Sequence, residues 1–368
     1  MNEAIPASCG AALVLLSGTV TLSDLGTIIS TVGGAAITIL ATMVMANILE
    51  SFGFFQWAAD MVAMKAKGSG IRLFWLVNLL CFLMTLFFNN DGSILITTPI
   101  LLILLRKMGL KPHQQIPYLL SGALTATASS APIGVSNIVN LIALKIVDMS
   151  LYMNAAMMFV PSTLGLLVMV SLLYLHFREN LPRTINTAPV GPSEHPILGH
   201  HPHHYPPHLP GHLHKAFEKW AAAPLSEAVS AQPSFLQRLS DPKEKNKFVR
   251  NIFLFLFHSA FIMGILVSLM SNLFNNHPAL MIGTLTLTKM HLAPLALKIS
   301  YLSTVIGSDM GSLLLPMGTL ATLMWMHICR KGKVKISWSR YIRTTIVVIP
   351  VTIAFTWTVL YFWVSTLL

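Results

Sequence analysis

The sequence predicts an all-α polytopic membrane protein built from two repeats, and three observations support this fold class. The 368 residues are 54% hydrophobic and only 10% charged, whereas a soluble domain carries about 25% charged residues. Several apolar stretches approach the ~20 residues that a helix needs to cross a bilayer, and they are continuous rather than alternating, which disfavours a β-barrel. One polar pattern, Phe-Asn-Asn, interrupts an apolar run in each half of the chain.

The Phe-Asn-Asn pattern marks equivalent breaks in the two halves. In the first half it opens the stretch Phe88–Gly92, inside an apolar run that extends from Leu73 to Leu105. In the second half it opens Phe274–Pro278, inside a run that begins near Ile252. Its recurrence indicates an internal repeat with a polar site between the copies, an arrangement that many membrane proteins use to build a pocket near the bilayer midplane.

The first repeat is expected to occupy residues 1–177 and to hold about five or six membrane segments. After the first break, the apolar run Ser93–Leu105 has only 13 residues, which as a helix would cover roughly 20 Å of the ~30 Å hydrocarbon core. We therefore expect the break to lie below the membrane surface. Non-helical backbone at that depth is tolerated only where it is buried in protein or lines a cavity.

Residues 117–146 have a different composition from a lipid-facing helix. Small and hydroxylated residues dominate, and Pro132-Ile133-Gly134 stands in the middle. This pattern predicts a closely packed, broken helix that forms a re-entrant hairpin. A spanning helix over 154–177 is expected to follow and to close the repeat.

A long polar segment, 178–250, divides the two repeats. Its middle is rich in Pro and holds eight of the fourteen His, and its end is dense in Lys and Arg. By the positive-inside rule we expect a cytoplasmic linker. Its first interpretation is a disordered connection and its second a metal-sensing tail, with His200, His201, His203 and His204 as weak candidate ligands.

The second repeat, residues 251–368, is expected to hold about four membrane segments. A spanning helix over 251–274 precedes the second break, and a short apolar run over 279–287 follows it. The stretch 301–328 repeats the small-residue, broken pattern, and 344–368 is a final span. The basic stretch before that span is expected in the cytoplasm, which would leave the C-terminus outside.

Titratable residues within the apolar stretches are the candidates for proton coupling. Asp91 and Asp309 are the acidic residues placed deep in such stretches, where a charge costs at least ~2.5 kcal/mol on insertion scales. His277 lies beside the second break and could carry a proton. A structural alternative for Asp91 is a turn that caps the next helix.

Uncharged polar residues at the breaks are the candidates for binding a solute. Asn side chains offer donors and acceptors together, and free N–H groups at a helix start bind oxygen-rich solutes. Their alternative roles are helix capping, inter-helix hydrogen bonding and close packing. The candidate substrate-binding residues are Asn89, Asn90, Ser136, Asn137, Asn140, Asn275, Asn276, Ser308 and Thr319.

Charge and cysteine content exclude several other classes. The net charge of +11 comes mostly from Lys and Arg between the apolar runs, where they report membrane orientation rather than nucleic-acid binding. Cys9, Cys81 and Cys329 have no paired spacing, so neither a disulfide framework nor a CxxC-type metal site is expected. No nucleophile–base arrangement or HExxH spacing occurs, so we expect neither an enzyme nor a cofactor.

Five short motifs, in order, carry a resemblance to a known family. They are 50–59, 88–99, 135–142, 271–278 and 305–327. In these stretches the chain resembles the arsenite/antimonite efflux permeases (ArsB-type) of the ion transporter superfamily. The resemblance implies an inverted-repeat secondary transporter, with a re-entrant hairpin and a broken helix in each half around a central site. The chain is shortened relative to the family, which usually has more helices at its N-terminus and at the start of its second half.

The function that this resemblance implies is export of arsenite or antimonite against entering protons, through a multi-pass protein of the bacterial cytoplasmic membrane. Asp91 and Asp309 would be the proton-linked residues, and Asn and Ser groups would bind the hydroxyls of the solute. The expected partners are the inorganic solute, protons and the lipid bilayer; a homodimer and a separate ATPase subunit stay open. The alternatives are a sodium/proton or anion carrier of the same superfamily, and a metal-sensing protein on a degenerate transporter scaffold.

Overall fold

The computed structural model of the protein describes residues 4–18, single positions between 26 and 41, and the two long stretches 44–185 and 259–367. Within these residues every regular element is helical and no strand occurs. The side chains of Asn90 and Asp91 lie outside the described set. So does most of the predicted linker, including the four candidate His ligands.

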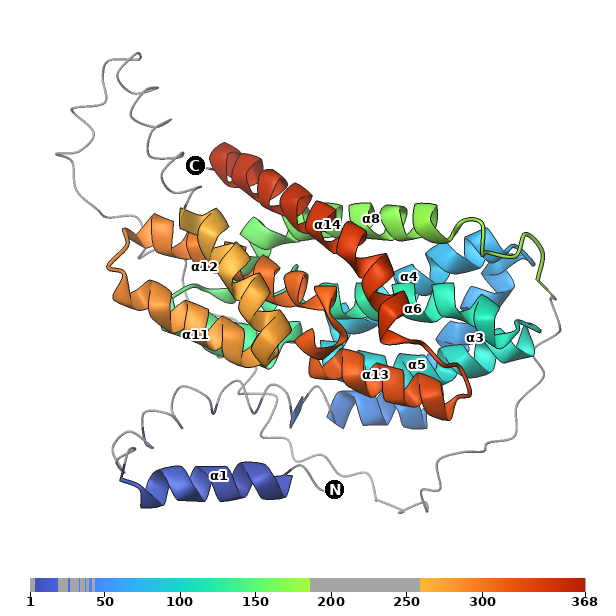
Figure 1. Ribbon diagram of the computed structural model, residues 1–368, viewed down its shortest axis with the longest axis horizontal. Coiled ribbons are helices and arrows are strands. Elements are labelled where there is room, and N and C mark those ends of the chain that lie inside the picture. The colour runs from blue at the N-terminus through green and yellow to red at the C-terminus, as the bar shows by residue number, and fades with distance from the viewer. Residues whose placement is uncertain are drawn as a thin grey trace, which may run out of the picture. The chain divides into compact units, whose positions relative to one another are not determined.

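Both halves of the chain follow one order of elements (Figure 1). A helix leads to a Phe-Asn turn and a second helix, then to a broken helix, then to a long apolar helix. In the first half, after α1 (Ala4–Leu16) and α3 (Phe54–Ala66), these elements are α4 (Gly70–Phe87), α5 (Asn90–Lys107), α6 (Pro112–Ala128), the short helix η1 (Gly134–Ser136), α7 (Ile138–Ile146) and α8 (Leu151–Phe177). In the second half they are the helix Ser259–Phe274, α11 (Asn276–Lys289), α12 (Pro294–Asp309), the short helices η3 (Gly311–Leu314) and η4 (Pro316–Gly318), α13 (Leu320–Lys331) and α14 (Trp338–Leu367).

The two repeats are interleaved rather than stacked end to end. The helix that follows the Phe-Asn turn in each repeat packs against the short helix of the other repeat, so α5 meets α13 and α11 meets α7. The two long apolar helices, α8 and α14, pack against each other. They run in opposite directions: the chain leaves α8 at the right of Figure 1, whereas α14 ends at the left. Reciprocal packing with reversed direction is the arrangement of an inverted repeat.

The segment over residues 117–146 is broken as predicted, but it is not a hairpin. Helix α6 ends at Ala128 and α7 begins at Ile138; α6 packs mainly against α4 and α5, whereas α7 packs against α11. The hairpins of the fold are the helix pairs joined at the Phe-Asn turns. In the first pair α4 packs against α5, and in the second Gly283 of α11 faces Val267.

The helix after the Phe88–Gly92 break is longer than its apolar run, so the expected depth of this break stays a prediction. Helix α5 begins at Asn90, not near Ser93, and its 18 residues extend about 27 Å, close to the thickness of the hydrocarbon core. The cause is Asn89, whose Oδ1 accepts a hydrogen bond from the Gly92 N–H over 2.6 Å and so starts the helix three residues early. Helix α11, with 14 residues, does remain short of a full crossing.

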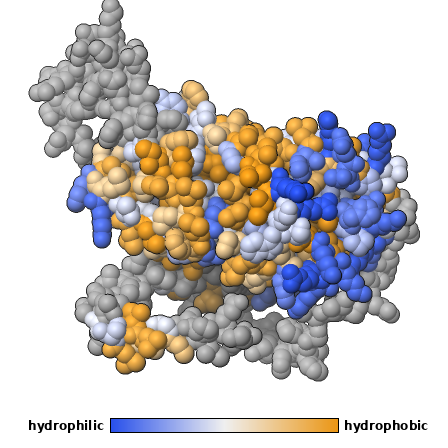
Figure 2. Space-filling model, viewed as in Figure 1, coloured by the Kyte–Doolittle hydropathy of each residue, from blue (hydrophilic) through white to orange (hydrophobic). Residues whose placement is uncertain are grey.

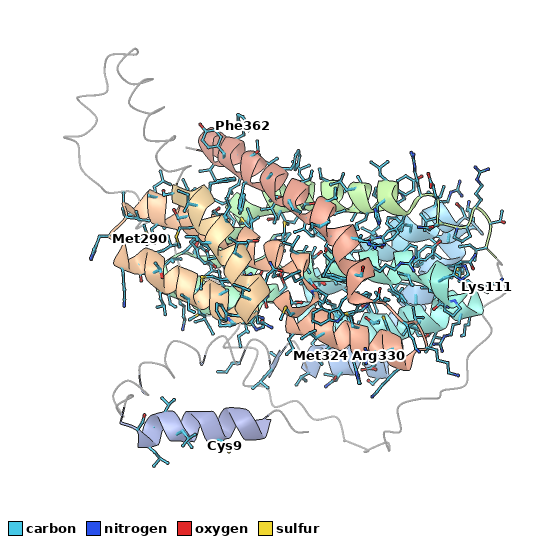
Figure 3. The ribbon with its side chains drawn as sticks, viewed as in Figure 1. Cys9, Lys111, Met290, Met324, Arg330 and Phe362 are labelled. Carbon is cyan, nitrogen blue, oxygen red and sulfur yellow. The ribbon has the colours of Figure 1, made fainter. Side chains whose placement is uncertain are left out.

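Basic residues gather at one end of the helices. Arg106 and Lys107 end α5, and Arg330 and Lys331 end α13; the Arg106 guanidinium donates to the Gly332 carbonyl and ties these ends together. Lys111 lies at the same side of the view, opposite Met290 (Figure 3). Figure 2 shows a hydrophilic area at this end and a broad hydrophobic surface beside it. We call the end that carries Arg106, Lys107, Arg330 and Lys331 the basic end.

The described helices include two that are long and apolar enough to cross a membrane, Leu151–Phe177 and Trp338–Val364. Two shorter apolar helices, Gly70–Leu86 and Ser259–Phe274, are the first arms of the hairpins. The broken helices contain irregular backbone between their parts, and at membrane depth such backbone must be buried by the surrounding protein.

Candidate functional site

A buried carboxylate from the second repeat is held by three side chains of the first repeat. Asp309, the last residue of α12, has no exposed surface. Its Oδ2 accepts from Ser130 Oγ over 2.8 Å and from Asn140 Nδ2 over 2.8 Å. Its Oδ1 accepts from Asn137 Nδ2 over 3.2 Å. The site is therefore shared by the broken helices of both repeats. In the structure we call the stretch between α6 and α7 the first break and the stretch between α12 and α13 the second break, and we call the two Phe-Asn-Asn interruptions the Phe-Asn turns.

Asn137 is oriented toward Asp309 by its role as the N-cap of α7. Its Oδ1 accepts from the Val139 N–H over 3.0 Å, a bond typical of helix starts. This bond fixes the direction of the amide, because only the NH₂ end is then left to face Asp309. Asn140 lies one turn further along α7 and presents its own NH₂ group. The positive end of the α7 dipole also favours a negative charge at this position.

The second Phe-Asn turn reaches the same place from α11. Asn275 has a positive φ (φ 80°, ψ 152°), a backbone conformation that residues other than glycine rarely adopt, and its Oδ1 accepts from the His277 N–H over 3.3 Å. The next residue, Asn276, is buried, and its backbone carbonyl accepts from Ser308 Oγ over 3.3 Å. Since Ser308 precedes Asp309 in α12, Asn276 borders the carboxylate site.

Buried polar atoms near Asp309 have hydrogen-bonding capacity that the described part of the chain does not use. Asn140 Oδ1, Asn276 Nδ2 and Asn154 Nδ2 are buried and form no hydrogen bond within the described part of the chain. Buried polar groups are normally paired because an unpaired one costs about 1–3 kcal/mol. One carbonyl acceptor and two N–H donors suit hydroxyl groups, which both donate and accept.

Asn154 and Asn140 both lie close to Gly134, between α6 and α7. A Cβ atom built on Gly134 would lie 3.2 Å from Asn154 Nδ2 and 3.8 Å from Asn140 Cβ. Asn154 belongs to α8 and is 1% exposed. The long helix of the first repeat thus adds a donor next to the amides of α7.

Other predicted residues have structural partners of their own. Thr319 caps α13, accepting from the Thr322 N–H over 3.0 Å, and the Ser136 hydroxyl donates to the Ile133 carbonyl over 2.9 Å. Asn89 caps α5, which is the alternative role considered for the turn residues. His277 is half-buried at the start of α11. Their roles in binding, like those of Asn90 and Asp91, stay predictions.

Three polar residues close to the breaks were not among the predicted site residues. They are Ser130, Asn154 and Asn272. Asn272 lies in the helix before the second turn, where its Nδ2 donates to the Gly311 carbonyl over 2.7 Å and its Oδ1 accepts from the Leu315 N–H over 2.8 Å. Their common signal is a polar side chain in an apolar or small-residue stretch, which alone does not separate a site residue from a packing residue.

The described residues contain no group of three or more His, Cys, Asp or Glu that could hold a metal ion. Cys81 and Cys329 are buried in α4 and α13, and Cys9 is exposed. The carboxylate site is built from one acidic group together with neutral amides and a hydroxyl.

The interleaved inverted repeats and the buried carboxylate between their broken helices define the class: a polytopic α-helical membrane transporter. A family model described as arsenical pump membrane protein matches residues 2–196 and 252–364. The chain therefore belongs to the arsenical pump membrane protein family and is a membrane arsenical pump. The unmatched stretch, 197–251, contains the four candidate His ligands.

Relatives support this membership along the whole chain. A putative arsenical pump membrane protein of Bacillus subtilis (strain 168) is 49% identical over 424 aligned positions, covering 99% of this chain and 95% of the relative. An arsenical pump membrane protein of Escherichia coli is 26% identical over 383 positions, covering 93% and 89%. One of Yersinia enterocolitica is 26% identical with the same coverage. The first alignment spans more positions than the 368 residues here, so that relative holds residues without a counterpart in this chain.

Proposed function

We propose that the chain exports arsenite or antimonite in exchange for protons, and that Asp309 carries the proton. The observation that carries the proposal is the contact of the buried Asp309 carboxylate with Ser130, Asn137 and Asn140 across the two repeats. A group bound by both repeats at once is sensitive to their relative movement. Change of its charge can therefore be coupled to alternating access.

The solute proposed for the site is an uncharged, hydroxylated acid. Arsenite is such a molecule at neutral pH, and each of its hydroxyls donates one hydrogen bond and accepts others. The unpaired Asn140 Oδ1 would accept from a hydroxyl, and the unpaired Asn276 Nδ2 would donate to one. Asn137 donates to Asp309, and Ser308 donates to the Asn276 backbone carbonyl. These two residues complete the proposed pocket.

The same carboxylate suits the proton-carrying step. Three neutral donors can hold Asp309 in its ionised form, since charge-assisted hydrogen bonds are about twice as strong as neutral ones. Uptake of a proton removes the charge and weakens these bonds, which would loosen the contact between the repeats. Asp91 and His277 remain proposed as further proton-linked residues at the two Phe-Asn turns.

The proposed orientation follows from the basic end. Clustered Arg and Lys residues stay in the cytoplasm, so the ends of α5 and α13 would face inward in a bacterial cytoplasmic membrane. We further propose that residues 1–177 and 251–368 form the two repeats and that 178–250 links them on the cytoplasmic side. A homodimer and an ATPase subunit are proposed partners that this geometry does not require.

The test is arsenite movement in membrane vesicles under an imposed pH gradient. Asp309→Asn should reduce gradient-driven arsenite movement to the level of vesicles without the protein, because Asn cannot release a proton. The matched control is Asp148→Asn, which removes an exposed carboxylate at a left-handed position (φ 50°) that Asn tolerates. Unchanged, gradient-driven transport by Asp309→Asn would refute the proton role. Movement of sodium but not arsenite would favour the sodium/proton carrier instead.

A further inference from the structure

The Ser130 hydroxyl has one hydrogen to donate, but it lies within hydrogen-bond distance of two acceptor groups. Its Oγ lies 2.8 Å from Asp309 Oδ2 and 2.9 Å from the backbone carbonyl oxygen of Thr127. A hydroxyl donates one hydrogen bond and accepts up to two. A carbonyl oxygen only accepts, so the Ser130 proton cannot serve Thr127 and an ionised Asp309 together.

The conflict has two solutions, one for each protonation state of Asp309. When Asp309 is ionised, the Ser130 hydroxyl turns toward Oδ2 and donates to it. When Asp309 is protonated on Oδ2, its O–H donates to Ser130 Oγ, and the Ser130 hydroxyl turns to the Thr127 carbonyl. The Ser130 hydroxyl changes between the two states by rotation about its Cβ–Oγ bond, and no heavy atom moves.

The two amide partners of Asp309 cannot reverse in this way. Asn137 is fixed by the bond from the Val139 N–H to its Oδ1, so it always presents donors to the carboxylate. Asn140 would have to rotate its whole amide by half a turn, away from the observed bond between its Nδ2 and Asp309. Among these three partners, only the hydroxyl matches both protonation states in place.

We propose that Ser130 is a positioning residue that reverses its hydrogen bond as Asp309 gains and loses a proton. This inference rests on the proposed function, in which Asp309 carries the proton, and adds the group that lets the site accept both states. The reversal also transmits the protonation state to the Thr127 carbonyl in the last turn of α6. The proton on the second repeat is thereby linked to the break of the first.

Other titratable groups lie on the elements that build the site or pack against it, and they are kept unchanged in the test. The Tyr301 hydroxyl of α12 donates to the Asn140 carbonyl over 3.2 Å, and the Tyr341 hydroxyl of α14 donates to the Leu313 carbonyl over 3.0 Å. The other titratable residues on these elements are His113 and Tyr118 on α6, Lys145 on α7, Tyr152, Tyr174 and His176 on α8, His277 and Lys289 on α11, Lys298 on α12, and Arg340, Arg343 and Tyr361 on α14.

The experiment compares Ser130→Ala with Ser129→Ala. Ser129 is also fully buried, but its hydroxyl donates to the Thr125 carbonyl within α6. Loss of the Ser130 hydroxyl removes a stronger bond from the ionised carboxylate than from the neutral acid. The pH of half-maximal arsenite transport should therefore rise by about one unit in Ser130→Ala, and Ser129→Ala should keep the wild-type profile.

A spectroscopic measurement separates positioning from general loss of packing. Infrared difference spectra of a pH step should show the carboxyl C=O band that disappears in Asp309→Asn. Ser130→Ala should shift this band, because the acid loses the acceptor of its O–H, and Ser129→Ala should leave it in place. Ser130→Cys keeps a small side chain that can donate and accept, but with weaker hydrogen bonds, so an intermediate shift is expected. This variant carries the test if the alanine variant does not fold.

Two failures are distinguishable. Equal pH profiles and equal C=O bands in Ser130→Ala and Ser129→Ala, with proton dependence still lost in Asp309→Asn, would overturn the role of Ser130 alone. Wild-type proton dependence in Asp309→Asn would overturn the proposed function on which that role rests.

Discussion

The breaks of the two repeats share a place in the fold and differ in their chemistry. The second break begins after the acidic residue Asp309, and its backbone is held from outside: Asn272 bonds to Gly311 and Leu315, and Tyr341 bonds to Leu313. The first break supplies neutral donors, and the Ser136 hydroxyl bonds only locally, to Ile133 and Ser130. The two repeats thus have the same order of helices but differ at their breaks. The acidic residue adjoins the break whose backbone is held by Asn272 and Tyr341, and the neutral ligands belong to the break whose Ser136 hydroxyl bonds only locally.

The largest expected effect comes from moving the charge between the breaks. Asp309→Asn alone should abolish gradient-driven arsenite transport. The double variant Asp309→Asn/Asn140→Asp reverses the bond between the two side chains and places the carboxylate near the start of α7, where the helix dipole favours it. We expect it to regain part of the transport in the vesicle assay. Asn140→Asp alone is the control, and it should be inactive because two carboxylates would face each other.

A glycine pair compares the packing of the two breaks. A Cβ on Gly318 would overlap the Ser312 backbone carbonyl, whereas one on Gly134 would meet side-chain atoms, Leu144 Cδ1 at 3.0 Å and Asn154 Nδ2 at 3.2 Å. Gly318→Ala should lower the free energy of unfolding by about 3 kcal/mol and Gly134→Ala by about 1 kcal/mol. Thermal unfolding in detergent measures both. Equal losses would show that the backbone is packed equally tightly at the two breaks.

The contacts of Asn272 with the second break are tested by Asn272→Leu. This change leaves the Gly311 carbonyl and the Leu315 N–H without their partner and should cost about 2–4 kcal/mol of stability. Ser136→Ala, the counterpart in the first break, should cost less than about 1 kcal/mol, because the Ile133 carbonyl keeps a bond from the Ser136 N–H. The same thermal assay applies. A larger loss in Ser136→Ala would reverse the comparison.

The smallest effect is expected at Asn154, the unpaired donor beside the first break. Asn154→Leu should leave the stability unchanged or slightly higher, because it removes an unsatisfied polar group. The KM for arsenite should rise about fivefold to tenfold for one lost hydrogen bond. Asn78→Leu is the matched control: Asn78 bonds to Ser121 and Thr125, so the same change should destabilise the protein. A KM equal to that of wild type in Asn154→Leu would exclude Asn154 from the solute pocket.

The breaks themselves were readable from the sequence because their causes are local. Pro, Gly and hydroxylated residues interrupt α6 and its counterpart α12, and the Phe-Asn turns start α5 and α11 with an Asn cap. Asp309 stood out because a charge in an apolar stretch is costly. The start of α5 was misjudged since apolar run length ignores the cap, which extends the helix into polar sequence. The place of the hairpins was misjudged because composition does not tell whether a chain turns back or continues after a break.

The sequence by itself determined the helical membrane class, the two repeats and the acidic residue at the second break, since each depends on composition and on spacing along the chain. Only the tertiary structure decided that Ser130, Asn137 and Asn140 meet Asp309, that α5 pairs with α13 and α11 with α7, and that Asn272 braces one break. These contacts join residues far apart in the chain. Which of many similar Asn and Ser side chains meet depends on how the repeats interleave, and no local pattern encodes that.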